Sequence, residues 1–234
     1  MIPPALPERL LALPLFGYGS LVNADTLRRK DVSVMEARLP GWERVWSHRI
    51  HHADPRTKEL RYPLALSIRP RSSVTIWGVA LCGLSQDEAA TVRSRELYYD
   101  TVEVTLETRG ARAEPWRPMQ AYTYVSPEGW QGAAEVAAAA KYEIWRSYVH
   151  VVLKGFADFY QEPGLHHFME TTSGWHAPYL EDHPPRYPRR ALVDIAASQE
   201  EKFNELVHTA IVRDRDAISR GSCPAGDTQP TVDR

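Results

Sequence analysis

Residues 14–29 read "PLFGYGSLVNADTLRR", a stretch that joins a short apolar run to two closely spaced glycines. A strand-like apolar run ends at Phe16, the segment GYGS follows, and a helix-like stretch begins near Asn23. Two glycines this close together allow a tight turn that leaves backbone N–H groups uncovered. A following helix N-terminus adds favourable potential, so the loop is suited to a small anion. The alternative is a strand-to-helix turn that holds no ligand.

Three well-known loop types do not fit this segment. A P-loop needs a Gly-Lys-Ser/Thr ending, and a dinucleotide fingerprint needs a third glycine at the right offset. A nucleophile elbow would need a glycine two residues after Ser20, where the sequence has Val22. The loop therefore either binds an anion in a way that differs from these three loop types, or is a structural turn without a ligand.

Composition indicates a globular protein. The chain has 234 residues, of which 43% are hydrophobic and 25% charged, with a formal net charge of −2. These values argue against global disorder and against a nucleic-acid partner. No apolar run is long enough to cross a bilayer, and the first residues lack the features of a signal peptide. With only Cys82 and Cys223 present, a disulfide framework is not expected, and we expect a cytoplasmic protein with no membrane partner.

The first half of the chain is rich in strand-sized runs and has one clear helix. Ser85 and Glu88 form a capping-box pattern, which predicts a helix over Ser85–Arg95. The runs that predict strands are Leu13–Tyr18, Leu64–Ile68, Val74–Leu84, Thr101–Thr108 and Gln120–Val125.

The second half has helical spacing. Apolar side chains recur every three or four residues over Glu135–Tyr160, and a second long helix is expected over Ser198–Ser219. The proline-rich stretch at residues 174–190 between them predicts an ordered connector. The layout is α+β, with strands first and helices later. We expect a main domain at residues 1–130, a helical extension at 131–220 and a disordered tail at 221–234.

Glu96 stands where the helix should end and a strand should begin. Tyr98 and Tyr99 follow it, and a carboxylate shielded among aromatic rings has its pKa raised toward neutrality. A general acid or base needs that environment. The alternative is a surface glutamate paired with Arg93 or Arg95.

The histidines do not predict a metal site. Groups of histidines occur at "HRIHH", "LHHF" and "WHAPYLEDH", but none of these spacings matches an established metal-binding pattern. Solvated or capping histidines are the expectation, and a histidine-metal hydrolase is kept as an alternative.

The order of five segments suggests a family. The segments are "LFGYGSL", "GWERVW", "YPLALSI", "IWGVALCGL" and "SRELYYDTVEV". Together they resemble the γ-glutamylcyclotransferase family, including its ChaC branch, over roughly residues 13–125. The resemblance implies an α+β fold: a small mixed β-barrel with flanking helices, here with a helical C-terminal extension.

The resemblance also implies a site and a reaction. In this family the substrate's free α-amine attacks its own γ-carbonyl, which releases 5-oxoproline and an amine or peptide. No metal or organic cofactor is expected, and Gly19 should have little room because the glutamyl group approaches the backbone. A γ-glutamylamine cyclotransferase and a non-catalytic γ-glutamyl-binding module stay open as alternatives. The implied residues are Glu96 as catalytic carboxylate, and Tyr18, Gly19, Ser20, Leu21 and Tyr99 as substrate-binding residues.

Overall fold

The computed structural model describes residues 6–27, 32–50, 52–53, 60–96, 98–110, 114–127 and 142–220. The predicted disordered tail at 221–234 lies outside these ranges, as does the start of the helix predicted over Glu135–Tyr160.

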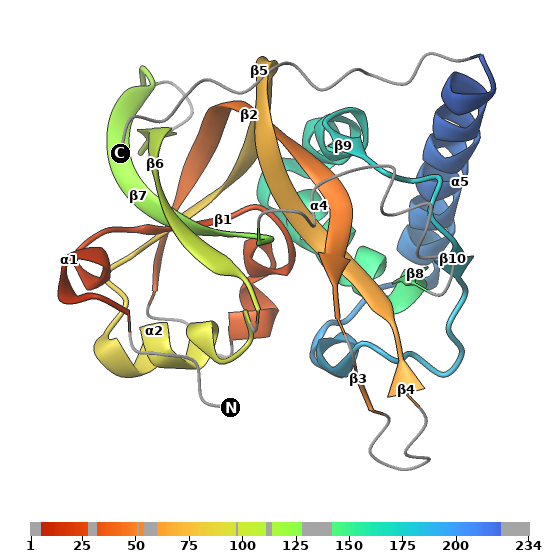
Figure 1. Cartoon of the computed structure of the whole chain (residues 1–234), viewed down its shortest axis with the longest axis horizontal. Coiled ribbons are helices and arrows are strands. Elements are labelled where there is room, and N and C mark those ends of the chain that lie inside the picture. Colours follow the sequence, from red (N-terminus) through yellow and green to blue (C-terminus); the bar gives the residue numbers. More distant parts are fainter. Residues whose placement is uncertain are drawn as a thin grey trace.

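Five strands form a closed barrel at the centre of the molecule (Figure 1). They run in the order β5-β1-β7-β6-β2, and β2 pairs with β5 to complete the circuit. The β1–β7 pair is parallel and the other pairs are antiparallel, so the barrel is mixed. The predicted small mixed β-barrel is therefore confirmed. Its strands are β1 (Leu15–Gly17), β2 (Ser33–Arg49), β5 (Pro63–Cys82), β6 (Asp100–Arg109) and β7 (Arg117–Val125).

The two longest strands differ most from the sequence prediction. The strands predicted at Leu64–Ile68 and Val74–Leu84 are a single strand, β5, and β2 was not predicted at all. The polar segment between the two predicted strands resembles a turn, but β2 pairs with β5 on both sides of it. The register shifts there, next to Gly41 at φ +80°, which bends the pair without ending it.

Short strands from the later part of the chain extend the same sheet. β8 (Glu143–Trp145) pairs with β5 and β10 (Tyr179–Leu180), and β9 (Thr172–Ser173) pairs with β2. β3 (His52–Ala53) and β4 (Leu60–Arg61) form a separate two-stranded pair. The expected division into a domain at 1–130 and an extension at 131–220 stays a prediction.

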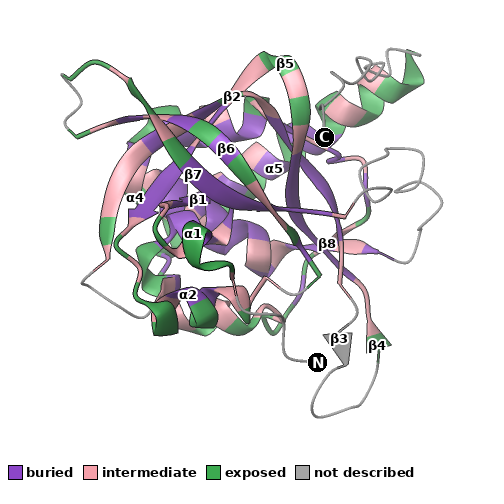
Figure 2. Cartoon of the chain, turned by 60° about the vertical axis from the view of Figure 1, so that its left-hand side comes forward, coloured by how far each residue is buried: buried purple, intermediate pink, exposed green. Residues whose placement is uncertain are grey.

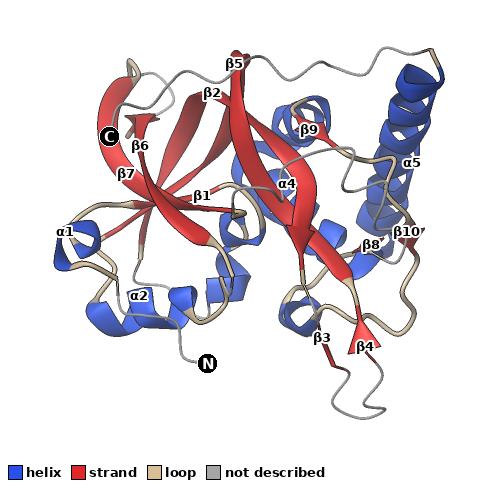
Figure 3. Cartoon of the chain, viewed as in Figure 1, coloured by secondary structure: helices blue, strands red, loops and turns tan. Residues whose placement is uncertain are grey.

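Helices lie on either side of the barrel (Figure 3). The capping box of Ser85 and Glu88 is confirmed, because each side chain accepts from the other's backbone N–H. The long helix differs from its prediction, because residues Glu143–Trp145 are a strand and the helix starts only at Arg146. The α-helices are α1 (Glu8–Leu11), α2 (Gln86–Arg93), α4 (Arg146–Glu170, interrupted at Gln161) and α5 (Ala197–Ser219). Short 3₁₀ helices are η1 (Ser20–Val22), η2 (Ala24–Leu27) and η3 (Pro188–Leu192).

The core lies inside the barrel and between the barrel and α4, as the buried strands in Figure 2 show. Fully buried aromatic side chains from both parts of the chain meet there, among them Phe16, Trp46, Phe156, Phe168 and Trp175. Burial of such rings provides much of the driving force that holds α4 on the sheet. In the described ranges no helix is both long and apolar enough to pass through a membrane.

Candidate active site

Two adjoining cavities lie where β1 leaves the barrel. The inner one has a volume of about 30 Å³ and the outer one about 210 Å³. Ser20, Glu96, Tyr99 and Tyr148 line both. All the site residues expected from the sequence line the inner cavity: Tyr18, Gly19, Ser20, Leu21, Glu96 and Tyr99.

The loop after β1 presents backbone N–H groups that the fold does not use. The N–H of Val22 donates to the carbonyl of Gly19 (3.0 Å) and starts the short helix η1. In the described part of the chain, no acceptor receives the N–H groups of Gly19, Ser20 or Leu21. Because these residues line the inner cavity, the loop has the uncovered donors that the sequence predicted.

A buried arginine, Arg44 of β2, holds this loop from behind. Its Nε donates to the carbonyl of Tyr18 (2.9 Å), and its Nη1 donates to Thr171 Oγ1 (2.8 Å). Nη2 donates to the carbonyl of Trp77. The Arg44 guanidinium also lies over the rings of Phe156 (4.9 Å) and Phe168 (5.1 Å).

Arg44 keeps its charge although it is completely buried. Burial lowers the pKa of its guanidinium to about 9, so it stays protonated at neutral pH. No carboxylate pairs with it among the described residues, and its partners are carbonyl and hydroxyl oxygens. Arg44 lies in the segment "GWERVW", where nothing local in the sequence marks it as buried or predicts a role for it.

The other side of the loop is fixed to α4. Asn23 Nδ2 donates to the carbonyl of Val151 (2.9 Å), and its Oδ1 accepts the N–H of Asp25 (3.1 Å). Gly155 lies so close that a Cβ there would be 2.6 Å from the backbone nitrogen of Asn23. The loop is therefore held between β2 and α4.

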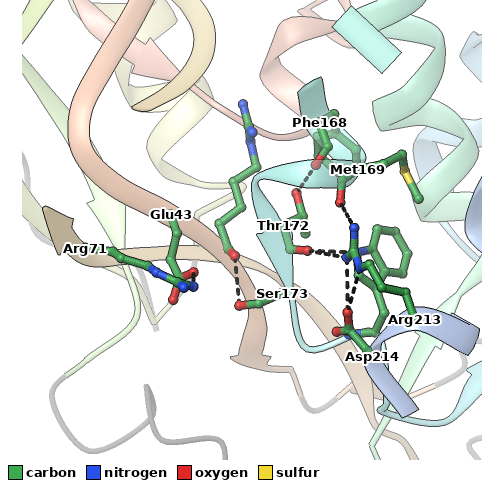
Figure 4. Close-up of polar contacts among 10 residues, drawn as sticks. Glu43, Arg71, Phe168, Met169, Thr172, Ser173, Arg213 and Asp214 are labelled. Carbon is green, nitrogen blue, oxygen red and sulfur yellow. Dashed lines mark hydrogen bonds and ion pairs between the residues drawn. The ribbon is translucent and has the colours of Figure 1, made fainter. Parts of the chain in front are cut away.

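The last turn of α4 is itself held in place, as Figure 4 shows. The Arg213 guanidinium of α5 donates to the carbonyls of Met169 (3.1 Å) and Thr172 (3.4 Å). Ser173 Oγ donates to the carbonyl of Arg44 (3.3 Å). The segment that receives the Arg44 side chain is thus bound to both α5 and β2.

Tyrosine hydroxyls line the inner cavity and stay neutral. Tyr18 donates to the carbonyl of Tyr124 (2.7 Å), and Tyr99 donates to the carbonyl of Leu66 (2.6 Å). Burial raises the pKa of both phenols well above the usual value. The Tyr99 ring also stacks on His48, with ring centroids 3.4 Å apart.

His48 shows that one histidine prediction was wrong. Its ring is completely buried, with Nδ1 3.0 Å from Ser126 Oγ, so it is neither solvated nor a helix cap. Within the ranges that the structure describes, no cluster of three His, Cys, Asp or Glu residues could hold a metal ion.

Glu96 follows the end of α2 and is half-buried. Burial raises the pKa of its carboxyl group, and the charges of Arg95, Arg189 and Arg93 oppose that shift. In the described part of the chain its carboxylate makes no hydrogen bond or close ion pair. Glu96 is therefore not the arginine-paired surface residue of the alternative.

The two neighbouring arginines contact other groups. Arg93 donates to the main-chain carbonyls of Glu96 (3.3 Å) and Tyr99 (3.0 Å). Arg95 donates to the carbonyl of Thr26 (3.1 Å) and reaches Ser20 Oγ (3.4 Å). Arg95 thus connects α2 to the loop, a role that sequence reasoning missed because it depends on contacts distant in sequence.

The outer cavity is completed by the later part of the chain. Trp145 ends β8, Tyr148 lies in the first turn of α4, and Tyr187, Pro188 and Arg189 come from the segment at η3. These residues were expected only to belong to a helix or a connector. Their side chains meet Ser20, Glu96 and Tyr99 only through tertiary packing, which a local pattern does not reveal.

Comparison with known proteins gave structural matches only. No family model matches the chain, and neither does any curated protein. One similar solved structure is a selenomethionine-labelled yeast γ-glutamyl cyclotransferase specific to glutathione, at 12% identity and a TM-score of 0.46. That match covers 86% of this chain and 96% of the yeast chain.

A second similar structure is a solution structure of an Arabidopsis thaliana protein. The two are 21% identical with a TM-score of 0.35, and the match covers 51% of this chain and 74% of the other. The solved structures that resemble this chain include γ-glutamyl cyclotransferases, the family that its sequence motifs resemble.

Proposed function

We propose that this chain is a γ-glutamylcyclotransferase that releases 5-oxoproline from a γ-glutamyl peptide or amine. The observation that carries the proposal is the shared cavity: the loop Tyr18–Leu21, Glu96 and Tyr99 all line it. Uncovered amides, a half-buried carboxylate without a partner and neutral phenols are the groups that an intramolecular acyl transfer uses.

The nucleophile in this reaction belongs to the substrate. The α-amino nitrogen attacks the γ-carbonyl carbon, the bond from that carbon to the leaving nitrogen breaks, and a five-membered lactam forms. The enzyme has to hold the glutamyl chain folded back, and good orientation can contribute about 7–11 kcal/mol to an intramolecular reaction. The small inner cavity beside the Tyr18–Leu21 loop suits this task.

Glu96 moves the proton. The α-amine arrives as an ammonium group, and the Glu96 carboxylate accepts one proton so that the nitrogen can attack. The protonated Glu96 gives that proton to the leaving nitrogen as the C–N bond breaks. The restored carboxylate then carries the second proton of the attacking nitrogen to the departing amine, so that a neutral lactam and an ammonium product are formed. A raised pKa serves both steps, because the group has to accept and release a proton near neutrality.

The loop amides stabilise the negative charge in this proposal. The N–H groups of Gly19, Ser20 and Leu21 are free to donate to the substrate α-carboxylate or to the oxyanion that develops on the γ-carbonyl. Arg44 fixes these amides by binding the carbonyl of Tyr18 from the protein side.

A panel assay tests the proposal. Purified protein is incubated with γ-glutamyl amino acids, glutathione and γ-glutamylamines, and 5-oxoproline release is measured. Release from any member supports a cyclotransferase, and the preferred member distinguishes peptide from amine substrates. Binding of the panel without release would identify a non-catalytic module instead.

Gly19 tests the loop. A Cβ at this position would lie 3.4 Å from the hydroxyl of Tyr148 and 3.5 Å from Leu66 Cδ1, so alanine fits the protein itself. The two extra methyl groups of valine would occupy the inner cavity where the substrate binds. We expect Gly19→Val to raise KM by at least about tenfold, equivalent to about 1.4 kcal/mol. Steady-state kinetics and circular dichroism of Gly19→Val, with Gly19→Ala as the smaller change, check this. A folded Gly19→Val protein with wild-type KM would contradict the assignment of the loop to the substrate site.

The pH dependence tests the base. Because the pKa of Glu96 is raised above the ordinary carboxyl value, its protonated, inactive form persists to higher pH than for an exposed glutamate. The rate should therefore fall as pH decreases through this raised pKa, with a midpoint above about 4.3. A kcat/KM profile measured from pH 4 to pH 9 checks this. An acidic limb with its midpoint at or below that of a free glutamate contradicts the assignment.

A further inference from the structure

The outer cavity carries more positive than negative charge. Arg95 and Arg189 both line it, and Glu96 is the one carboxylate among its described lining residues. Arg189 acts on Arg95, because burial and the positive charge of Arg189 both lower the pKa of Arg95. Two guanidinium groups that share one cavity favour a further anion there.

Arg189 is the less firmly held of these two arginines, because Arg95 donates hydrogen bonds to Thr26 and Ser20. Arg189 is half-buried, and no hydrogen bond or ion pair holds its side chain within the described part of the chain. Its neighbour Arg190 differs, because Arg190 bonds Glu200 (2.5 Å) and the carbonyl of Val193 (2.8 Å). The charge of Glu96 acts on both Arg189 and Arg95, so one carboxylate faces two partly desolvated guanidinium groups in this cavity, and a ligand anion would supply the second negative charge.

The backbone next to Arg189 is nevertheless firmly held. The buried Asp182 carboxylate accepts the N–H groups of Ser147 (2.9 Å) and Arg186 (2.6 Å). Ser147 Oγ accepts the N–H of Tyr187 (2.9 Å) and donates to Asp182. This network fixes the segment before η3 to the first turn of α4, and it thereby positions the backbone that carries Arg189 beside the cavity.

We propose that Arg189, assisted by Arg95, forms a subsite for a carboxylate carried by the leaving group of the substrate. This inference rests on the proposed function, in which the glutamyl part lies beside the Tyr18–Leu21 loop and the bond that breaks lies beside Glu96. The leaving group then extends into the outer cavity, since Glu96 lines both cavities. γ-Glutamyl amino acids and peptides carry such a carboxylate, and γ-glutamylamines do not.

The test compares two substrates that differ mainly in charge. γ-Glutamylglycine ends in a carboxylate, and γ-glutamylglycinamide ends in an uncharged amide of nearly the same shape. The wild-type protein should turn over the acid with a kcat/KM at least about tenfold higher than the amide, as expected for one charge-assisted hydrogen-bonded contact. In Arg189→Gln the value for the acid should fall by at least about tenfold, and the value for the amide should change by less than about twofold.

Arg190→Gln is the matched control. It removes the same charge from the next residue, whose side chain bonds Glu200, and both substrates should keep their wild-type kinetics. Thermal unfolding of each variant shows that the proteins are folded. The inference is overturned if wild type treats both substrates alike, or if Arg189→Gln reduces turnover of both equally, which would place the arginine on the glutamyl part.

Failure of the proposed function gives a different result. If wild type releases 5-oxoproline from neither compound, the cyclotransferase assignment fails, and calorimetric binding of the same two compounds tests the subsite. The carboxylate subsite is supported if the wild-type protein binds the acid more tightly than the amide and Arg189→Gln binds the two compounds equally. Equal binding of acid and amide overturns it.

Discussion

Glu96→Gln is expected to lower kcat for 5-oxoproline release by about 10²–10⁴-fold, the usual contribution of general acid–base catalysis. Glutamine has nearly the shape of glutamate and still forms hydrogen bonds, but it cannot accept and return a proton. Substrate affinity should change little, because the loop amides and the arginines at the cavity are untouched. Initial rates at saturating substrate, for wild type and variant, measure the effect.

Stability gives this prediction an internal control. The pKa of Glu96 is raised in the folded state, so its carboxylate destabilises the fold once the pH rises above the unfolded pKa. Glutamine has no such charge, and Glu96→Gln should unfold at the same temperature as wild type or higher at pH 7. A surface glutamate would behave otherwise, with a small stability change and no loss of rate. A folded variant that keeps more than about a tenth of wild-type kcat contradicts the proposed mechanism.

Arg44→Met is expected to cause the largest loss of stability. The buried carbonyls of Tyr18 and Trp77 would lose their donor, and an unsatisfied buried group costs about 1–3 kcal/mol. Removing a buried charge recovers some desolvation energy, but the two carbonyls belong to the backbone and cannot be removed with it. We expect the free energy of unfolding to fall by about 3 kcal/mol, which for a chain of this size lowers the Tm by roughly 10 °C.

Arg213→Met is the matched control for Arg44. Arg213 also donates to two backbone carbonyls, but its side chain is 45% exposed, so water can replace its hydrogen bonds. Its replacement should lower the free energy of unfolding by less than about 1 kcal/mol. Calorimetric or denaturant unfolding of both variants makes the comparison. If Arg44→Met and Arg213→Met lower the free energy of unfolding equally, burial does not increase the contribution of the Arg44 hydrogen bonds to stability.

The parts of this structure that sequence predicts are those with local signals. The capping box of Ser85 and Glu88 acts over three residues, and it marks the start of α2 correctly. The glycine pair of the loop and the position of Glu96 after the helix are also local, and the structure places Gly19 and Glu96 at one cavity. Their roles in catalysis stay predictions.

What the sequence does not reveal depends on pairing between distant segments. The charged stretch around Arg44 looks exposed, yet β2 is a barrel strand that brings Arg44 to a carbonyl 26 residues earlier and a hydroxyl 127 residues later. The "PRSS" segment of β5 resembles a turn, but its partner strand continues on both sides of it. Arg189 reaches the cavity through the bonds that Asp182 and Ser147 make to its segment, which no periodicity records.

The order of the strands has a consequence for association between molecules. Exposed sheet edges are templates on which a second chain can add a strand, and long flat edges promote aggregation. Here β2 and β5 pair with each other to close the barrel, and the described sheet is bounded by β10 and β9, which are two residues long each. Edge strands of two residues offer another chain few backbone groups to pair with. Together with the closure of the barrel, they protect this protein against edge-to-edge polymerisation at high concentration.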